Sequence, residues 1–75
     1  MNRERVVSSN IISIGYDPLA RTLEVEFGDD PTHPGRVYRY FEVPSEIHRD
    51  LMAAASHGKF LHQNVMWVFS YKRLQ

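Results

Sequence analysis

The chain has 75 residues, of which 43% are hydrophobic, so it is long enough for one small globular domain and too apolar for a disordered segment. Its nine basic and nine acidic residues give a net charge of zero, which disfavours strong non-specific binding to nucleic acid, because that binding relies on an excess of positive charge. The chain contains no cysteine, which excludes disulfide bonds and thiolate metal ligands and fits a reducing compartment.

The sequence shows no sign of a membrane or export segment. No apolar run approaches the roughly 18 residues that a membrane helix needs, and the basic start leads into Val6, Val7 and two serines rather than into the apolar run of a signal peptide. We therefore expect a cytoplasmic protein that does not contact a membrane. Residues 1–75 are expected to form a single domain, with residues 1–6 as a flexible N-terminus.

Residues 10–16 form the first predicted strand. Apolar residues alternate along it, and Gly15 inside the run indicates a bulge or a close backbone approach. A turn follows, in which Pro18 presets the backbone angle and the side chain of Asp17 accepts hydrogen bonds from the backbone two residues on.

The second predicted strand, residues 22–27, has the clearest pattern in the chain. Polar and apolar residues alternate without a miss, so its apolar side chains are expected to face a core while Glu24 and Glu26 face water. Residues 28–35 contain two prolines and two glycines and predict a long loop that is exposed and mobile.

The third strand is predicted over residues 36–42, and its facing has two alternatives. If its Val and Phe side chains point inward, Arg39 goes with them and needs a buried partner, which is costly. If Tyr38 and Tyr40 point inward, Arg39 lies on the same face as Glu24, where opposite charges on neighbouring strands attract. We predict the second register.

The second half of the chain predicts two helices, over residues 45–56 and 59–68. Pro44 and Ser45 are typical of a helix start, and Gly58 is typical of a left-handed C-cap. Apolar residues recur on one stripe of each segment, which is the pattern of a helix that packs on a core.

The predicted fold class is α+β, a three-stranded antiparallel meander followed by two helices packed on one face of the sheet. The predicted core residues are Leu23, Val25, Phe27, Ile47, Leu51, Leu61 and Val65. Residues 69–75 are either a short strand or a tail, and residues 72–75 are expected to be a tail.

The sequence has no constellation typical of an enzyme. The four histidines, at positions 33, 48, 57 and 62, have none of the spacings that are typical of zinc sites. Ser56 and His57 are adjacent and therefore point to different sides of a helix. Glu24 and Glu26 are typical of a solvated strand face with Arg39 as a partner. We therefore expect no enzymatic activity, no catalytic residue, no metal and no cofactor.

Aromatic and basic residues are concentrated near the C-terminus. Residues 58–75 carry three Lys or Arg side chains and no acidic residue. Aromatic rings interleaved with cations on a small sheet are typical of single-stranded nucleic-acid binding. The alternative is that a small domain uses its large rings as core, with their polar atoms at the rim. The candidate ligand-binding residues are Lys59, Trp67, Tyr71, Lys72 and Arg73.

Several short stretches, in their order along the chain, carry a family resemblance. They are Val7-Ser8-Ser9-Asn10-Ile11, Gly15-Tyr16-Asp17, Leu23-Glu24-Val25-Glu26-Phe27, Tyr38-Arg39-Tyr40, Val43-Pro44, Leu51 and Ala55-Ser56-His57-Gly58-Lys59-Phe60. In these stretches the sequence resembles the KTSC domain, a small module named for its occurrence at the C-terminus of some lysyl-tRNA synthetases and also found as a free-standing bacterial protein. The resemblance covers about residues 7–71.

Two segments depart from the family pattern. The family joins its second and third strands by a tight glycine turn, whereas the connection here, residues 28–36, is longer. After the position of Phe60 the family has an aromatic residue followed by Asn, where this chain has Leu61-His62. The family has no established activity, and its synthetase context implies RNA as a partner. We therefore predict a small non-catalytic binding module whose partner is RNA or, alternatively, a protein that binds an exposed sheet face or edge strand.

Overall fold

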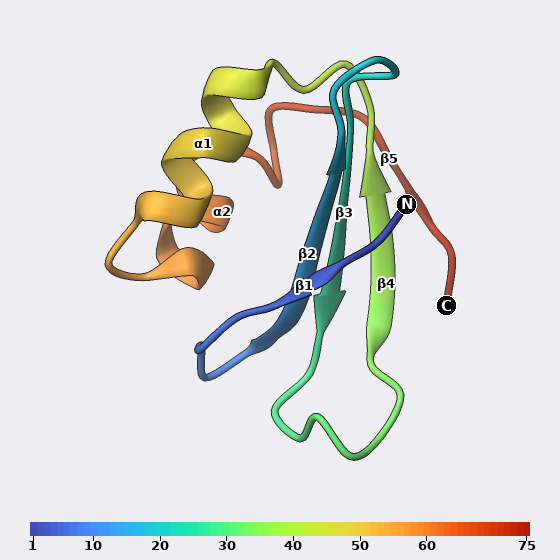
Figure 1. Ribbon diagram of the computed structural model, residues 1–75, viewed down its shortest axis with the longest axis vertical. Coiled ribbons are helices and arrows are strands. Elements are labelled where there is room, and N and C mark those ends of the chain that lie inside the picture. Colours follow the sequence, from blue (N-terminus) through green and yellow to red (C-terminus); the bar gives the residue numbers. More distant parts are fainter.

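A five-stranded antiparallel sheet with two helices on one of its faces makes up the computed structural model, which describes all residues 1–75 (Figure 1). The elements in chain order are β1 (Glu4–Arg5), β2 (Ile11–Asp17), β3 (Thr22–Phe27), β4 (Arg36–Tyr40), α1 (Ser45–Ala53), α2 (His57–Asn64) and β5 (Tyr71–Arg73). The strands lie in the order β1-β2-β3-β4-β5, so every strand pairs with its neighbours in the sequence of strands. Neither helix is long and apolar enough to cross a membrane.

The two outer strands enlarge the expected three-stranded meander. β1 lies within residues 1–6, where a flexible end was expected, and pairs with β2 through Glu4 and Ile14. β5 lies within residues 69–75, where a strand and a tail were both open, and it runs into the expected tail. Strands of two and three residues are too short to show an alternating pattern, so the sequence could not reveal them.

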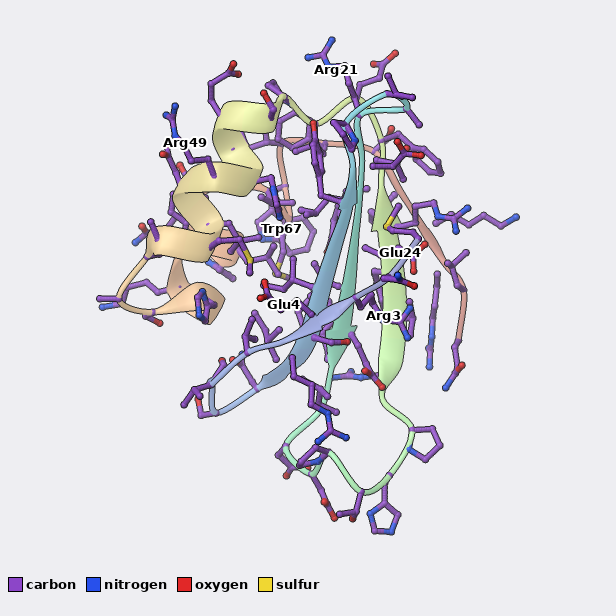
Figure 2. All side chains as sticks on the ribbon, in the orientation of Figure 1. Arg3, Glu4, Arg21, Glu24, Arg49 and Trp67 are labelled. Atoms are coloured by element: carbon purple, nitrogen blue, oxygen red, sulfur yellow. The ribbon has the colours of Figure 1, made fainter.

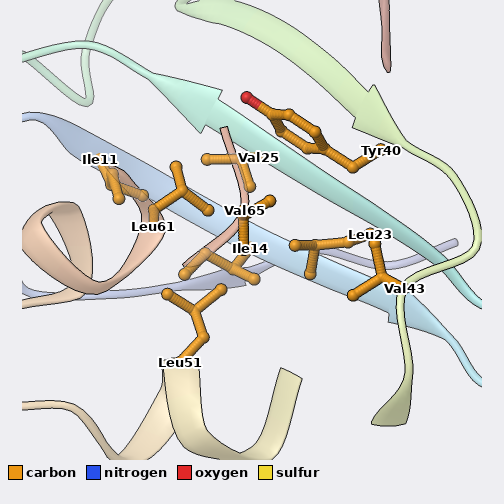
Figure 3. Close-up of a cluster of buried hydrophobic side chains, with 9 residues drawn as sticks. All are labelled: Ile11, Ile14, Leu23, Val25, Tyr40, Val43, Leu51, Leu61 and Val65. Atoms are coloured by element: carbon orange, nitrogen blue, oxygen red, sulfur yellow. The ribbon is translucent and has the colours of Figure 1, made fainter. Parts of the chain in front are cut away.

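The core lies between the helices and the sheet (Figure 3). The nine fully buried side chains of this cluster are Ile11, Ile14, Leu23, Val25, Tyr40, Val43, Leu51, Leu61 and Val65. Five of the seven predicted core residues are among them. The other two, Phe27 and Ile47, are only partly buried and pack against the edge of the cluster.

The helix ends differ from the predicted ones. α1 ends at Ala53, and Gly58 does not cap it, because no glycine has a positive φ and Gly58 lies in the first turn of α2. Ser56 instead caps α2, with its Oγ accepting a hydrogen bond from the backbone nitrogen of Lys59 at 3.2 Å. A Cβ on Gly58 would lie 2.6 Å from Oδ1 of Asn10, so the glycine is needed for a close contact rather than for a left-handed turn.

The cap of α1 and the first turn of the sheet can also be compared with the predictions. α1 begins at Ser45, as predicted, but its N-cap is Pro44, without a side-chain hydrogen bond, so Ser45 is the first helical residue and not the cap. The turn after β2 is as predicted, since Oδ1 of Asp17 accepts hydrogen bonds from the backbone nitrogens of Leu19 at 3.0 Å and Ala20 at 3.3 Å.

The position of Leu51 at the centre of the helix–sheet interface leads to a stability prediction. Leu51→Ala should lower the free energy of unfolding by about 2–5 kcal/mol, because it removes a fully buried side chain and leaves a cavity. Thermal and denaturant unfolding followed by circular dichroism measures the loss. Ile47→Ala on the same helix is the matched control and should cost less, since Ile47 is only partly buried. An unchanged melting temperature for Leu51→Ala would contradict the placement of α1.

Candidate functional site

The pairing of β3 with β4 places charged side chains on one face of the sheet and tyrosine side chains on the other. Glu24 lies opposite Arg39, and Leu23 lies opposite Tyr40, which is buried in the core. Side chains alternate between the two faces of a strand, so Tyr38 and Tyr40 face the helices while Arg39 lies on the helix-free face. The predicted register of the third strand is therefore confirmed.

The carboxylate of Glu24 is buried between two arginines on the helix-free face. Figure 2 labels Glu24 and one of these arginines, Arg3. Its Oε2 accepts hydrogen bonds from Nη2 of Arg39 at 2.6 Å and from Nε of the same residue at 3.1 Å. Its Oε1 accepts a hydrogen bond from Nη1 of Arg3 at 2.8 Å. The Glu24 side chain is only 6% exposed, so the expectation that it faces water is wrong. The reason is the start of the N-terminal segment, which lies over Gly15 next to Glu24 and supplies Arg3.

Gly15 makes the crossing of the N-terminal segment possible. A Cβ at this position would lie 2.9 Å from Cγ of Arg3 and 3.0 Å from the backbone oxygen of Asn2, too close for a larger residue without a shift. The Arg3 side chain also donates a hydrogen bond from Nε to Oγ of Ser13 at 3.1 Å. The close backbone approach that the sequence predicted at Gly15 is therefore present, and its partner is the start of the chain.

The surroundings of Glu24 and Glu26 hold both carboxyl groups in the ionised form. Burial by itself would raise the pKa of Glu24, but the hydrogen bonds and positive charges of Arg39 and Arg3 outweigh it, so the pKa lies below its usual value. The hydrogen bond from Ser13 is the main cause that lowers the pKa of Glu26. Burial opposes it, and the backbone N–H of Gly35 adds a smaller lowering contribution. Every oxygen of the two carboxylates accepts a hydrogen bond, which is the arrangement of a structural network.

Tyrosines from β4 and β5 form a continuous aromatic cluster at the edge of the sheet. The Tyr38 and Tyr71 rings are stacked with centroids 5.4 Å apart and planes 26° apart, and the Tyr40 ring lies 5.9 Å from the Tyr71 ring. Phe27 meets Tyr38 edge-on at 5.6 Å. Desolvation raises the pKa of the buried Tyr40 hydroxyl to about 12, with smaller contributions from Tyr38 and Tyr71. Tyr71 is 54% exposed, so the aromatic cluster extends from the core to the surface of the domain.

We call this surface the β4–β5 aromatic edge and define it by Arg36, Tyr38, Tyr71 and Arg73. Arg73 lies directly opposite Tyr38, and Arg36 lies on the same face because it is two residues from Tyr38 in β4. Neither arginine forms an ion pair with an acidic side chain. A small hollow of about 110 Å³ opens beside Arg36 and is lined by Arg36, Tyr38, Phe27, Tyr40 and Met66.

The five candidate residues from the sequence do not form one patch. Tyr71 and Arg73 lie on the aromatic edge, whereas Lys72, between them, points to the helix-free face beside Arg39. Trp67 is 78% exposed in the turn after α2, directly after Met66, which lines the hollow of the aromatic edge. Lys59 lies at the start of α2, on the opposite side of the molecule from β5 (Figure 1).

Sequence reasoning left two members of the aromatic edge out of the candidate site. Tyr38 was assigned to the strand and its core face, and Arg36 was treated only as a strand end. The Tyr-x-Tyr pattern was a usable signal for Tyr38, but only the pairing of β4 with β5 brings its ring onto Tyr71. Nothing in the local sequence marks Arg36, because its position depends on the register with β3 and β5.

Three of the four histidines make contacts through their rings. His33 Nδ1 lies 2.7 Å from Oδ2 of Asp30 in the exposed loop, His57 Nδ1 lies 2.9 Å from the backbone oxygen of Leu51, and the His48 ring stacks on Tyr16 at 4.6 Å. No group of three His, Cys, Asp or Glu side chains is arranged to hold a metal ion.

Comparison with known proteins shows the family of this fold. The family model of the KTSC domain matches residues 7–69, and the chain therefore belongs to the KTSC domain family. The crystal structure of a KTSC domain protein from Yersinia pestis superposes with a TM-score of 0.87 at 36% identity, over 99% of this chain and 97% of that one. The resemblance drawn from the short sequence stretches is thus confirmed.

Relatives of two kinds share the domain. An uncharacterized protein of Stutzerimonas stutzeri is 41% identical over 63 residues, which cover 84% of this chain and 82% of the relative. A lysine–tRNA ligase of Nostoc is 34% identical over 59 residues, which cover 79% of this chain and 10% of the ligase. The domain therefore resembles both a protein of similar size and a small part of a much larger enzyme.

The buried Glu24 leads to a prediction on acid stability. Its pKa is lowered by folding, so its contribution to stability is present above the pKa of the unfolded chain, near 4.5, and is lost as the pH falls through the lower pKa of the folded state. Glu24→Gln should lower the free energy of unfolding at neutral pH by about 2 kcal/mol, because it leaves two partly exposed arginines without their shared partner.

The measurement is thermal unfolding as a function of pH between neutral and acid conditions. The Glu24→Gln variant should lose less stability in acid than the unmodified protein. Glu42→Gln, a change at an exposed glutamate, is the control and should leave the pH profile nearly unchanged. Identical pH profiles for Glu24→Gln and the unmodified protein would show that the carboxylate is not a stabilising centre.

Proposed function

We propose that this domain is a small non-catalytic binding module that holds single-stranded RNA on the β4–β5 aromatic edge. The observation that carries the proposal is the stack of Tyr38 and Tyr71, which runs from the core to a half-exposed ring at the edge of the sheet, with Arg73 opposite Tyr38. Single-stranded RNA is commonly held by bases stacked on aromatic rings, with cations beside them for the phosphates.

The exposure of the aromatic residues supports this function. A core explanation accounts for Tyr40, which is buried, and for the inner part of Tyr38, but it gives no reason for Tyr71 and Trp67 to be more than half exposed. Tyr71 stacks on Tyr38, which lines the hollow of the aromatic edge, and Trp67 follows Met66, which also lines it. A ring that is open on one side offers a stacking surface to a base of any sequence.

The relatives and the charge of the chain bear on the kind of RNA binding. The similar segment in a lysine–tRNA ligase associates the domain with an enzyme whose name includes tRNA, which favours RNA as the partner here. The net charge of zero means that affinity must come from the local cations and from stacking rather than from the whole surface. Binding is therefore expected to be modest and to weaken with salt.

The second candidate is a protein partner that docks on the same end of the molecule. The observation in its favour is the exposure of large apolar side chains, with Trp67 at 78% and its neighbour Val68 at 64%. Exposed aromatic residues are common anchors in protein interfaces. The two candidates differ in their response to salt, since an interface built on apolar contacts depends on it only weakly.

A fluorescence titration with a single-stranded oligouridylate of about 12 nucleotides at low salt tests the proposal. Tyr71→Ala should weaken binding about tenfold, because stacking of one base is worth about 1–3 kcal/mol, and Trp67→Ala should also weaken it. Leu19→Ala is the control, since it removes an even more exposed apolar side chain from the turn between β2 and β3. Circular dichroism shows whether each variant is folded. Absence of binding at low salt, or equal affinity for Tyr71→Ala and the control, would refute RNA binding at this edge.

A further inference from the structure

Lys72 is a charged residue of the edge strand β5 that has no charged partner. It points to the helix-free face, directly opposite Arg39 on the neighbouring strand. Like charges directly opposite each other across two strands are destabilising. Arg39 has its charge balanced by Glu24, but Lys72 forms no ion pair and no side-chain hydrogen bond.

The same face carries a row of cations across the sheet. Gly15, Glu24, Arg39 and Lys72 are cross-strand neighbours in that order, and Arg3 lies over Gly15. Neighbouring strands lie about 4.8 Å apart, so the two cations nearest the β5 edge are adjacent. In this row three cations face the single carboxylate of Glu24, which both arginines already share.

The acids nearest to this row do not balance Lys72. Glu26 lies on the same face, two residues along β3 from Glu24, and is already hydrogen-bonded to Ser13 in β2 and to the backbone of Gly35. No helix covers this face, because α1 and α2 pack on the other one (Figure 1). Arg39 keeps 39% of its side chain exposed, so a ligand has access to the pair that it forms with Lys72.

We propose that the bound RNA wraps around the edge strand β5, with its bases stacked on Tyr38 and Tyr71 on the helix side and its phosphates held by Lys72 and Arg39 on the helix-free face. This inference rests on the proposed function and adds to it the route that the RNA follows around the domain. β5 has three residues, and their alternation places the aromatic and the basic contacts on opposite sides of one exposed strand. An anion on the helix-free face also removes the repulsion between the two opposed cations.

Another reason for a lysine on an edge strand is protection against pairing with other chains. Lys72→Glu separates the two explanations. The new carboxylate still protects the edge, and it lies opposite Arg39, so the melting temperature should stay the same or rise. Binding of phosphates should fall, because one cation is lost and a repulsive charge is added.

The experiment compares oligouridylate binding by the unmodified chain, Lys72→Glu and Lys59→Glu at several salt concentrations. Lys59→Glu makes the same charge change at an exposed lysine on the other side of the molecule. We expect a loss of about tenfold for Lys72→Glu and a change of less than about twofold for Lys59→Glu at the same salt. A third variant, Lys72→Gln, should reduce the log–log salt slope by about 0.7, the value for one phosphate contact in single strands.

The outcomes are distinguishable from a failure of the proposed function. If Tyr71→Ala weakens binding but both Lys72 variants bind and respond to salt like the unmodified chain, the path around β5 is wrong and the stacking site remains. If Lys59→Glu weakens binding as much as Lys72→Glu, the effect is general electrostatics and the path is again wrong. If the unmodified chain binds no oligouridylate at low salt, the proposed function falls, and this inference falls with it.

Discussion

The buried carboxylate of Glu24 is the interaction on which the arrangement of the sheet depends. A charge at this depth is tolerated only when it is paired and fully hydrogen-bonded, and here Arg39 from β4 and Arg3 from the N-terminal segment supply the partners. One pair fixes the register of β4 on β3, and the other holds the start of the chain over Gly15. Slipping β4 by one residue would carry Arg39 into the core and leave Glu24 without its closest partner.

The same register decides what the two faces of the sheet present. With Arg39 on the helix-free face, Tyr38 and Tyr40 must face the helices, where β5 adds Tyr71 to the cluster. The hydrophobic core and the aromatic edge are therefore one continuous structure. The basic row on the opposite face follows from the same pairing, since Lys72 is aligned with Arg39.

Two features could be predicted from the sequence: a strand whose polar and apolar residues alternate over six positions, and a register that pairs opposite charges. The facing of residues 22–27 and the Glu24–Arg39 register were predicted because a wrong register buries an unpaired arginine. The outer strands, the burial of Glu24 and the division of the candidate site were not predictable, because each depends on contacts between distant segments. Lys72 and Arg73 are adjacent in sequence, and only the presence of β5 as a strand sends them to opposite faces. The end of α1 and the start of α2 were missed because Ser56 caps the second helix and Gly58 lies in its first turn beside Asn10.

The most direct test of the account is a map of nuclear magnetic resonance chemical shifts, recorded on the isotope-labelled chain during titration with oligouridylate. The account predicts that perturbed backbone amides concentrate in β4, in β5 and in the turn at residues 65–70, with little change in α1 or in the loop at residues 28–35. Perturbations that centre on that loop or on the start of α2, or no perturbation at low salt, would contradict the claim that this domain binds RNA through the β4–β5 edge.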